Sequence, residues 1–249
     1  VVLLGVEIDC VDVSWAIAIA LDGLNAEVGG WICPTNLDVL RQCFESAEIR
    51  ELVQAADVVV ADGMPLIWAS RLAGRPLPER VAGSSLIETM PRAAAAVGAS
   101  IFLLGGNPGA SEGAAARLTA ANPDLRIAGA LCPPFGFERD PHELAQIEAE
   151  LRRAQPDIVF VGLGFPKQEH LIRRLRPVLP RAWFVSCGIS FSFVSGEVSR
   201  APRWIQRIGM EWLHRLFQEP RRLFRRYVIL GLPFLARVVS RAAVSRYRT

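Results

Sequence analysis

Residues 57–68 read DVVVADGMPLIW, and this stretch decides the fold. An apolar run from Val58 to Ala61 ends on Asp62 and a glycine, and Pro65 opens the apolar stretch that follows. A buried strand that passes into a helix in this way is typical of open α/β sheets, which bind ligands at the carboxyl ends of their strands. Asp62 therefore has two interpretations: it caps the helix that begins near Met64, or it carries chemistry.

The same alternation of strand and helix extends over about the first 190 residues. The sequence predicts strands at 2–8, 30–34, 57–61, 100–105, 126–132, 157–164 and 182–188, and helices at 37–55, 64–73, 85–97, 109–121, 140–154 and 166–176. Several of these strands are apolar on both faces, as strands between two helix layers are. We therefore expect an α/β fold, a layered domain with a largely parallel sheet.

Composition narrows the class of protein. The 249 residues, 51% of them hydrophobic, can bury one large core or a core with an extension. No basic segment precedes the first apolar run, which argues against a secreted protein. Five scattered cysteines without a C-x-x-C pair favour buried cytosolic thiols over disulfides or zinc. The sequence has no D-x-D motif and only three, widely separated histidines, so we expect no bound metal.

Charge is distributed unevenly along the chain. Residues 200–249 contain twelve arginines and two acids, Glu211 and Glu219, so this tail carries +10. Since the whole chain carries +3, the preceding residues carry −7. A basic tail on an acidic body indicates an anionic partner: nucleic acid, anionic lipid or a phosphate-bearing substrate.

Polar or glycine residues follow four of the predicted strands. In chain order they are Asn36, Asp62, the loop of Gly105, Gly106 and Gly109, and Gln168. The carboxyl ends of parallel strands meet at one edge of a sheet, so these residues should gather in one crevice. This convergence favours a chemical role for Asp62 over a simple helix cap.

Two of these loops have competing interpretations. The glycine loop at 105–109 brings backbone N–H groups and a helix N-terminus to a phosphate, or it is only a tight turn. In the second loop, Pro166 is expected to start a helix. The two residues after it, Gln168 and the only lysine of the chain, Lys167, have two interpretations. Either they point into the crevice and bind phosphate or sugar hydroxyls, or they form a solvated first turn. In the loop before the helix at 85–97, Arg80 is a candidate anion ligand, and Ser84 or Ser85 a candidate cap.

Four blocks of the sequence resemble, in order, the TagA/WecG/CpsF family of bacterial glycosyltransferases, which build teichoic acid linkage units, enterobacterial common antigen and exopolysaccharides. The blocks are VVVADGMPLIWASRLAGRPLPERVAG (58–83), IFLLGGNPGASEGAA (101–115), VFVGLGFPKQEHLI (159–172) and SRAPRWIQRIGMEWLHRLFQEPRRLFRRY (199–227). The resemblance implies a Rossmann-like catalytic core over 1–196. It also implies a basic helical C-terminal appendage over 197–249 that closes the active site and associates with the membrane.

The activity implied by the resemblance is the transfer of a sugar, with inversion, from a UDP-sugar to a polyprenyl-diphosphate-linked saccharide. It implies no cofactor and no metal, a cytoplasmic protein bound peripherally to the inner face of the cytoplasmic membrane, and a self-associating core. Asp62 is the implied catalytic base. The implied substrate-binding residues are Thr35, Asn36, Arg80, Gly105, Gly106, Gly162, Lys167, Gln168, Arg200, Arg215, Arg221 and Arg222.

The sequence departs from the family pattern at two positions. Many members read Thr-x-Asn where this chain has Pro34-Thr35-Asn36, so the threonine is displaced by one residue. Ser192 stands where relatives often carry an aspartate. The second departure lies in the 188–196 segment and bears on which sugar is donated.

Two other classes of function stay open at this point. A nucleotide-cofactor oxidoreductase would use the glycine loop for a dinucleotide, but the G-x-G-x-x-G fingerprint is missing. A nucleic-acid-binding module would use the basic tail, but it leaves the polar strand ends without a purpose. We expect no nucleic-acid partner.

The tail is expected to lie on a membrane rather than to cross it. Its apolar run, 227–236, is only ten residues long and is interrupted by Gly231 and Pro233, whereas a spanning helix needs about 20 apolar residues. Arginines beside leucine, phenylalanine and tryptophan suit helices in the interface with anionic headgroups. The alternative is that the tail's apolar side chains pack on the core and its arginines face solvent.

Overall fold

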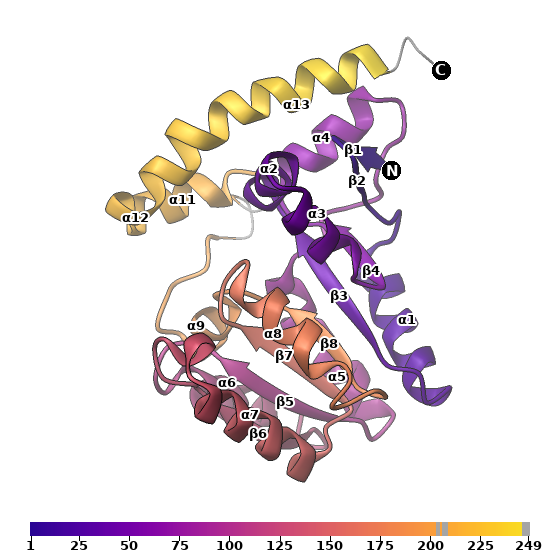
Figure 1. The fold of residues 1–249 in the computed structure, drawn as a ribbon, viewed down its shortest axis with the longest axis vertical. Helices are drawn as coiled ribbons and strands as arrows, with labels where there is room; N and C mark the ends of the chain where they lie inside the picture. Colours follow the sequence, from indigo (N-terminus) through magenta and orange to yellow (C-terminus); the bar gives the residue numbers. More distant parts are fainter. Residues whose placement is uncertain (203–204, 206–208, 246–249) are drawn as a thin grey trace.

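A computed structural model gives the structure of the protein and describes residues 1–202, 205 and 209–245. Its centre is a parallel six-stranded sheet with the strand order β4-β3-β8-β7-β5-β6. The strands are β3 (Gly30–Thr35), β4 (Val58–Ala61), β5 (Ser100–Gly105), β6 (Arg126–Leu131), β7 (Ile158–Gly162) and β8 (Trp183–Ser186). The predicted α/β class and the Rossmann-like parallel sheet are confirmed (Figure 1).

Helices cover both faces of this sheet. One apolar cluster contains buried side chains of α2 (Leu37–Glu45), α3 (Ala47–Gln54), α4 (Met64–Leu72), α7 (Pro141–Ala154) and α8 (Lys167–Leu175). The other contains those of α1 (Val13–Asn25), α5 (Gly83–Ala96), α6 (Ala110–Ala121) and α9 (Ser190–Ser195). A 3₁₀ turn, η1, lies at Phe137–Arg139.

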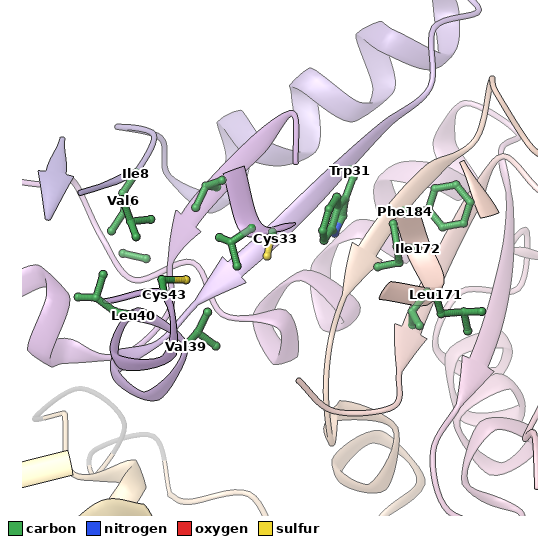
Figure 2. Close-up of a cluster of buried hydrophobic side chains, with 14 of the residues drawn as sticks. Val6, Ile8, Trp31, Cys33, Val39, Leu40, Cys43, Leu171, Ile172 and Phe184 are labelled. Carbon is green, nitrogen blue, oxygen red and sulfur yellow. The ribbon is translucent and has the colours of Figure 1, made fainter. Parts of the chain in front are cut away.

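Successive residues of the strands alternate between these two clusters. On β3, Trp31 and Cys33 enter the first cluster, and Ile32 between them enters the second. Figure 2 shows Trp31 and Cys33 in the first cluster with Val39 of α2 and Ile172 of α8. This period of two is the reason that the strands read as continuous apolar runs in the sequence.

The N-terminal segment differs from its prediction as one strand. Residues 2–8 form an antiparallel hairpin of β1 (Val2–Leu3) and β2 (Val6–Glu7), separate from the main sheet. Leu4 has a φ of 49° and Gly5 one of 84°, as the two central residues of a tight hairpin turn require. The single strand predicted over 2–8 is therefore wrong.

Two helical predictions also change. The structure has a helix at α1, which the sequence analysis did not predict, and the Asp12 side chain caps it by accepting from Trp15 N. The single helix expected over 37–55 is two helices, because Ser46 is extended, ends α2 and caps α3 at Ile49 N. Neither Ser84 nor Ser85 caps α5, which begins at Gly83 without a side-chain cap.

The cysteines also depart in part from expectation. All five are free, and Cys33, Cys43 and Cys187 are buried as expected. Cys10 is exposed and Cys132 partly exposed, so the prediction of buried thiols is wrong for these two.

The chain after residue 209 forms a helical appendage across one end of the core (Figure 1). Its elements are α11 (Glu211–Gln218), α12 (Pro220–Phe224), the π-helical η2 (Arg225–Gly231) and α13 (Leu232–Ser245). Phe234, Val238 and Ala242 lie at four-residue intervals on α13 and are buried in the same cluster as Leu66 of α4. The predicted basic helical appendage is therefore present.

Gly231 and Pro233 do not interrupt this helix, contrary to the prediction. Gly231 is the last residue of the π-helical η2, and the N–H of Leu232 donates to Tyr227 O, five residues back. The chain then continues as α13 with Pro233 in its first turn, where a helix does not need the N–H that proline lacks. As a result, Pro220–Val244 is a 25-residue helix that is long and apolar enough to cross a membrane. Only 17% of its most apolar window is buried in the protein.

Candidate active site

A cavity of about 500 Å³ opens where the carboxyl ends of β3, β4 and β8 meet the appendage. The core lines it with residues that come after strand ends, among them Asn36 and Asp62 directly after β3 and β4, Gly188 in the loop after β8, and Gln168 in the first turn of α8. The appendage lines it from α11, α12, η2 and the start of α13. The cavity therefore lies between the sheet edge expected to hold the site and the basic tail.

Asp62 does not cap the helix that follows it. Gly63, with a φ of 95°, occupies the N-cap position of α4, and no side chain caps that helix. The Asp62 backbone N–H donates to Thr35 O at 2.8 Å, which fixes the turn to the neighbouring strand. Among the described residues, no hydrogen-bond or ion-pair partner contacts the Asp62 carboxylate, so the capping interpretation is wrong and the carboxylate is available to a ligand.

The environment of Asp62 favours the neutral carboxyl more than water does around an ordinary exposed aspartate. Burial raises the pKa of the Asp62 carboxyl, Arg80 opposes this, and the Glu211 carboxylate raises it further. A raised pKa makes a carboxylate a stronger base once it is ionised.

Asn36 and Thr35 take different positions at the end of β3. Asn36 lines the cavity, and its Oδ1 caps α2 by accepting from Asp38 N at 3.0 Å and Val39 N at 3.1 Å. These bonds occupy the amide oxygen and leave the NH₂ group as the donor toward a ligand. Thr35 is fully buried behind the cavity wall and does not line the cavity.

Gln168 is held rigidly in the cavity wall. Its Oε1 accepts from Gly188 N at 3.1 Å, and its Nε2 donates to Glu169 Oε1 at 2.8 Å within the buried interior. One Nε2 hydrogen is left for a ligand, so Gln168 faces the cavity as a donor. Pro166 is the N-cap of α8 rather than its first residue.

Lys167 does not line the cavity, although it precedes Gln168. Its Nζ pairs with Glu138 at 2.8 Å and lies 5.0 Å from the centre of the Phe135 ring. The expectation that Lys167 points into the crevice is therefore wrong. The first turn of α8 sends Lys167 toward η1 and Gln168 toward the cavity.

The glycine loop is also outside the cavity. A Cβ on Gly105 would lie 2.7 Å from Gly162 O, and one on Gly162 would lie 2.8 Å from Gly188 O. Gly106 donates to Gly162 O at 2.8 Å and packs beside Phe191. Close packing of neighbouring strand ends thus explains why glycine occupies positions 105, 106 and 162. The oxidoreductase alternative required this loop to bind a dinucleotide, so the structure does not support that alternative.

Arginines of the core and the appendage line the same cavity as Asp62. Arg80, Arg215, Arg222 and Arg226 line the cavity. Arg80 Nη1 pairs with Glu211 at 2.6 Å, and Arg222 Nε pairs with Glu219 at 2.7 Å. Arg200 pairs with Glu88 and Glu211 but does not line the cavity, and Arg221 is exposed outside it.

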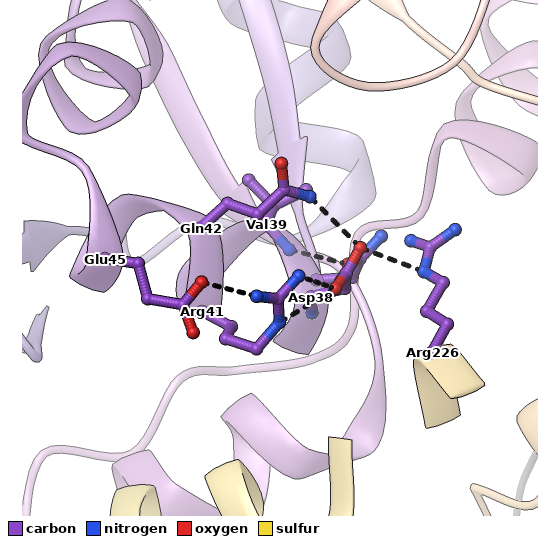
Figure 3. A network of polar contacts seen from close by, with 7 residues as sticks. Asp38, Val39, Arg41, Gln42, Glu45 and Arg226 are labelled. Carbon is purple, nitrogen blue, oxygen red and sulfur yellow. Dashed lines mark hydrogen bonds and ion pairs between the residues drawn. The ribbon is translucent and has the colours of Figure 1, made fainter. Parts of the chain in front are cut away.

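Asp38 connects the core to the appendage beside the cavity (Figure 3). Within α2 it accepts from Arg41 and Gln42, and its Oδ2 lies 3.0 Å from Nε of Arg226 in η2. Farther along, the Phe44 ring packs at 5.9 Å from that of Phe234. Sequence reasoning missed Asp38, Arg226 and Glu211 as site residues. Glu211 had one visible signal, since it is one of two acids in a strongly basic tail.

Glu169 is a second buried carboxyl in the cavity wall. It is 1% exposed, its Oε2 has no hydrogen-bond partner, and burial raises its pKa from 4.5 to about 7.

We predict that Glu169 makes the stability of the protein fall as pH rises. Its folded-state pKa lies above the unfolded value, so the folded state binds the extra proton, and stability declines from about pH 4.5 through 7. The loss should be roughly 2–4 kcal/mol. Denaturant unfolding at pH 5 and 8.5 should show this loss for wild type and a smaller one for Glu169→Gln.

A matched control for this test is Glu48→Gln. Glu48 occupies the first turn of α3 as Glu169 occupies that of α8, but it is exposed. The control should keep the pH dependence of the wild type. An equal pH dependence in Glu169→Gln would show that Glu169 is not the responsible group.

Within the residues that the structure describes, no three His, Cys, Asp or Glu side chains gather in a group suited to a metal ion. Positive charge at the cavity comes from the arginines named above.

The fold and the site together define a class: a Rossmann-like α/β protein with an arginine-lined cavity at the carboxyl ends of its strands, where such folds bind ligands. The particular assignment comes from comparison with known families. The chain belongs to the glycosyl transferase WecG/TagA/CpsF family, whose model matches residues 1–248. It is therefore a glycosyltransferase, as the sequence blocks suggested.

Two curated relatives carry the same name, N-acetylglucosaminyldiphosphoundecaprenol N-acetyl-beta-D-mannosaminyltransferase. The protein of Bacillus subtilis (strain 168) is 29% identical over 216 residues, which cover 87% of this chain and 81% of the relative. That of Bacillus spizizenii is 30% identical over 210 residues, covering 84% and 78%.

Proposed function

We propose that this protein is an inverting glycosyltransferase that transfers a sugar from a UDP-sugar to a polyprenyl-diphosphate-linked saccharide without a metal ion. The observation that carries the proposal is the Asp62 carboxylate, unpaired among the described residues, in a cavity that Arg80, Arg215 and two further arginines line. The names of the two Bacillus relatives, which contain a diphosphoundecaprenol acceptor, support the acceptor class.

In the proposed reaction, Asp62 accepts the proton of an acceptor-sugar hydroxyl. The oxygen of that hydroxyl forms a bond to the anomeric carbon of the donor, and the bond from this carbon to the UDP oxygen breaks. UDP leaves with the electron pair of that bond. Attack from the face opposite the leaving group inverts the anomeric configuration.

The arginines have a separate role in this proposal. Charge builds up on the diphosphate as UDP departs, and guanidinium groups that pair with phosphate oxygens in two-point contacts stabilise it. Arg80 belongs to the core, whereas Arg215 and Arg222 belong to the appendage. We therefore propose that the appendage, 197–249, completes the site of the 1–196 core.

We further propose that the protein acts at the inner face of the cytoplasmic membrane, bound peripherally through the appendage. The buried stripe of α13 packs on the core, while Ile229, Leu232 and Val244 are exposed on the same helical segment. Exposed apolar side chains among arginines favour an anionic bilayer surface, where each basic residue contributes about 1 kcal/mol.

The direct test is to screen UDP-sugars for transfer to a synthetic prenyl-diphosphate-linked N-acetylglucosamine. We expect one UDP-sugar to react, and UDP to bind more tightly than NAD or DNA. In a complex with the reactive donor or acceptor, Arg80 and Gln168 should lie within contact distance of the ligand. Transfer from no UDP-sugar, with tight binding of NAD or DNA, would contradict the proposal.

Chelation should leave transfer unaffected. In the proposed reaction arginines neutralise the leaving diphosphate, so a divalent ion is not needed for that step. Rates measured with and without EDTA should agree within about twofold. The proposal is contradicted if EDTA removes activity and added Mg²⁺ or Mn²⁺ restores it.

A further inference from the structure

The position of the Arg80 guanidinium is set by the appendage rather than by Asp62. Arg80 Nη1 lies 2.6 Å from Glu211 Oε2, and both side chains are mostly buried, at 18% and 13% exposed. The other oxygen of Glu211 lies 3.5 Å from Arg200 Nε. Glu211 thus sits between two arginines, while the neighbouring Asp62 pairs with neither of them.

Two carboxylates therefore compete for one guanidinium in the wall of this cavity. Asp62 and Glu211 both line it, and Arg80 lines it between the core and α11. An arginine drawn into an ion pair with Asp62 would stabilise the ionised carboxylate and make it a poorer proton acceptor. Glu211 holds Arg80 in the alternative ion pair.

Among the described residues, the charged groups that face Asp62 come from three parts of the chain. They are Arg80 from the loop before α5, Arg200 from the segment after α9, and Glu211 and Arg215 from α11. The three arginines lower the pKa of Asp62, whereas Glu211 raises it. Glu211 is the one anion in this set.

We propose that Glu211 is a positioning residue for sugar transfer: it binds Arg80 and so keeps the Asp62 carboxylate unpaired and able to accept the acceptor's proton. This inference rests on the proposed role of Asp62 as base. It assigns to the appendage a function besides supplying arginines, because α11 also supplies the anion that keeps one core arginine in place.

The test is the pH profile of kcat/KM for Glu211→Gln, with binding of UDP measured alongside. Without the Glu211 charge, Arg80 is free to pair with Asp62, so the acid limb should move about 0.5–1 unit to lower pH. The maximal kcat/KM should fall about 3–10-fold, since a less basic carboxylate is a weaker catalyst. UDP binding should be equal or tighter, because a negative charge has left the site.

Two further variants separate positioning from simple anchoring of the appendage. Glu211→Asp keeps the charge and should restore the acid limb of the wild type. Glu219→Gln removes the same charge from the same tail, where Glu219 pairs with Arg222, and its acid limb should stay in place. Weaker UDP binding in Glu211→Gln with an unmoved acid limb would overturn the inference in favour of an anchor.

The outcome for Asp62 distinguishes this inference from the proposed function. If Asp62→Asn stays active, the assignment of the base is wrong, and the Glu211 inference is overturned with it. If Asp62→Asn is inactive and Glu211→Gln keeps the profile of the wild type, only the role of Glu211 is overturned.

Discussion

Asp62→Asn is expected to abolish sugar transfer while the fold and UDP binding stay nearly intact. The amide has the shape of the carboxylate but cannot accept the proton, and loss of a general base costs about 10²–10⁴-fold in rate. Little stability should be lost, because Gly63 rather than Asp62 holds the N-cap position of α4. Transfer rate, UDP affinity and melting temperature of the purified variant provide the measurement.

The matched control is Asp57→Asn, at the opposite end of the same strand. Asp57 accepts from Trp31 N at 2.8 Å and pairs with Arg176 at 2.7 Å, so its change should lower the melting temperature but not the transfer rate. Activity of Asp62→Asn within about threefold of the wild type would remove Asp62 as the base.

Deletion of all residues after Glu197 should remove both sugar transfer and binding to anionic vesicles. The deletion takes away Arg215, Arg222 and Arg226 from the cavity wall, and Glu211 with them. It also removes twelve of the 28 basic residues, so that a tail of net charge +10 is lost from a core of net charge −7. Transfer assays and flotation with anionic liposomes at low and high salt measure the two losses.

The truncated core will expose α4, on which α13 packs, so its folding must be checked by circular dichroism before its activity is judged. A charge reversal elsewhere, Arg181→Glu, tests whether flotation depends on the tail. Arg181 is 71% exposed on the core, and its reversal should leave flotation unchanged. The role of the appendage would be contradicted by two results together. The full-length protein would not bind anionic vesicles, and the truncated core, shown to be folded, would still transfer sugar.

Much of the fold could be predicted because the strands of a sheet covered on both faces are apolar throughout. Each of the six strands of the main sheet overlaps its predicted range. The errors lie where local geometry overrides the apolar pattern. The two positive-φ residues, Leu4 and Gly5, turn an apparent strand into a hairpin, and a π-helical turn carries a helix through Gly231 and Pro233.

The site was predictable where it depends on strand ends and not where it depends on side-chain direction. Asn36, Asp62, Arg80 and Gln168 line one cavity, as their positions after strands and in a loop suggested. Lys167 precedes Gln168 in the chain but points to η1 instead. The roles of Asp38 and Glu211 arise from contacts between segments more than 100 residues apart, which no local pattern reports.

The distance in the chain between Asp62 and its appendage neighbours has a consequence for biosynthesis. Glu211 and Arg215 follow Asp62 by about 150 residues. At a translation rate of about 5–20 residues per second, roughly 8–30 s pass between the synthesis of the carboxylate and that of these partners. A nascent chain can pair its first strands in this interval but has no arginine-lined cavity. Sugar transfer therefore becomes possible only late in translation, when the emerging enzyme already carries the segment proposed to bring it to the bilayer.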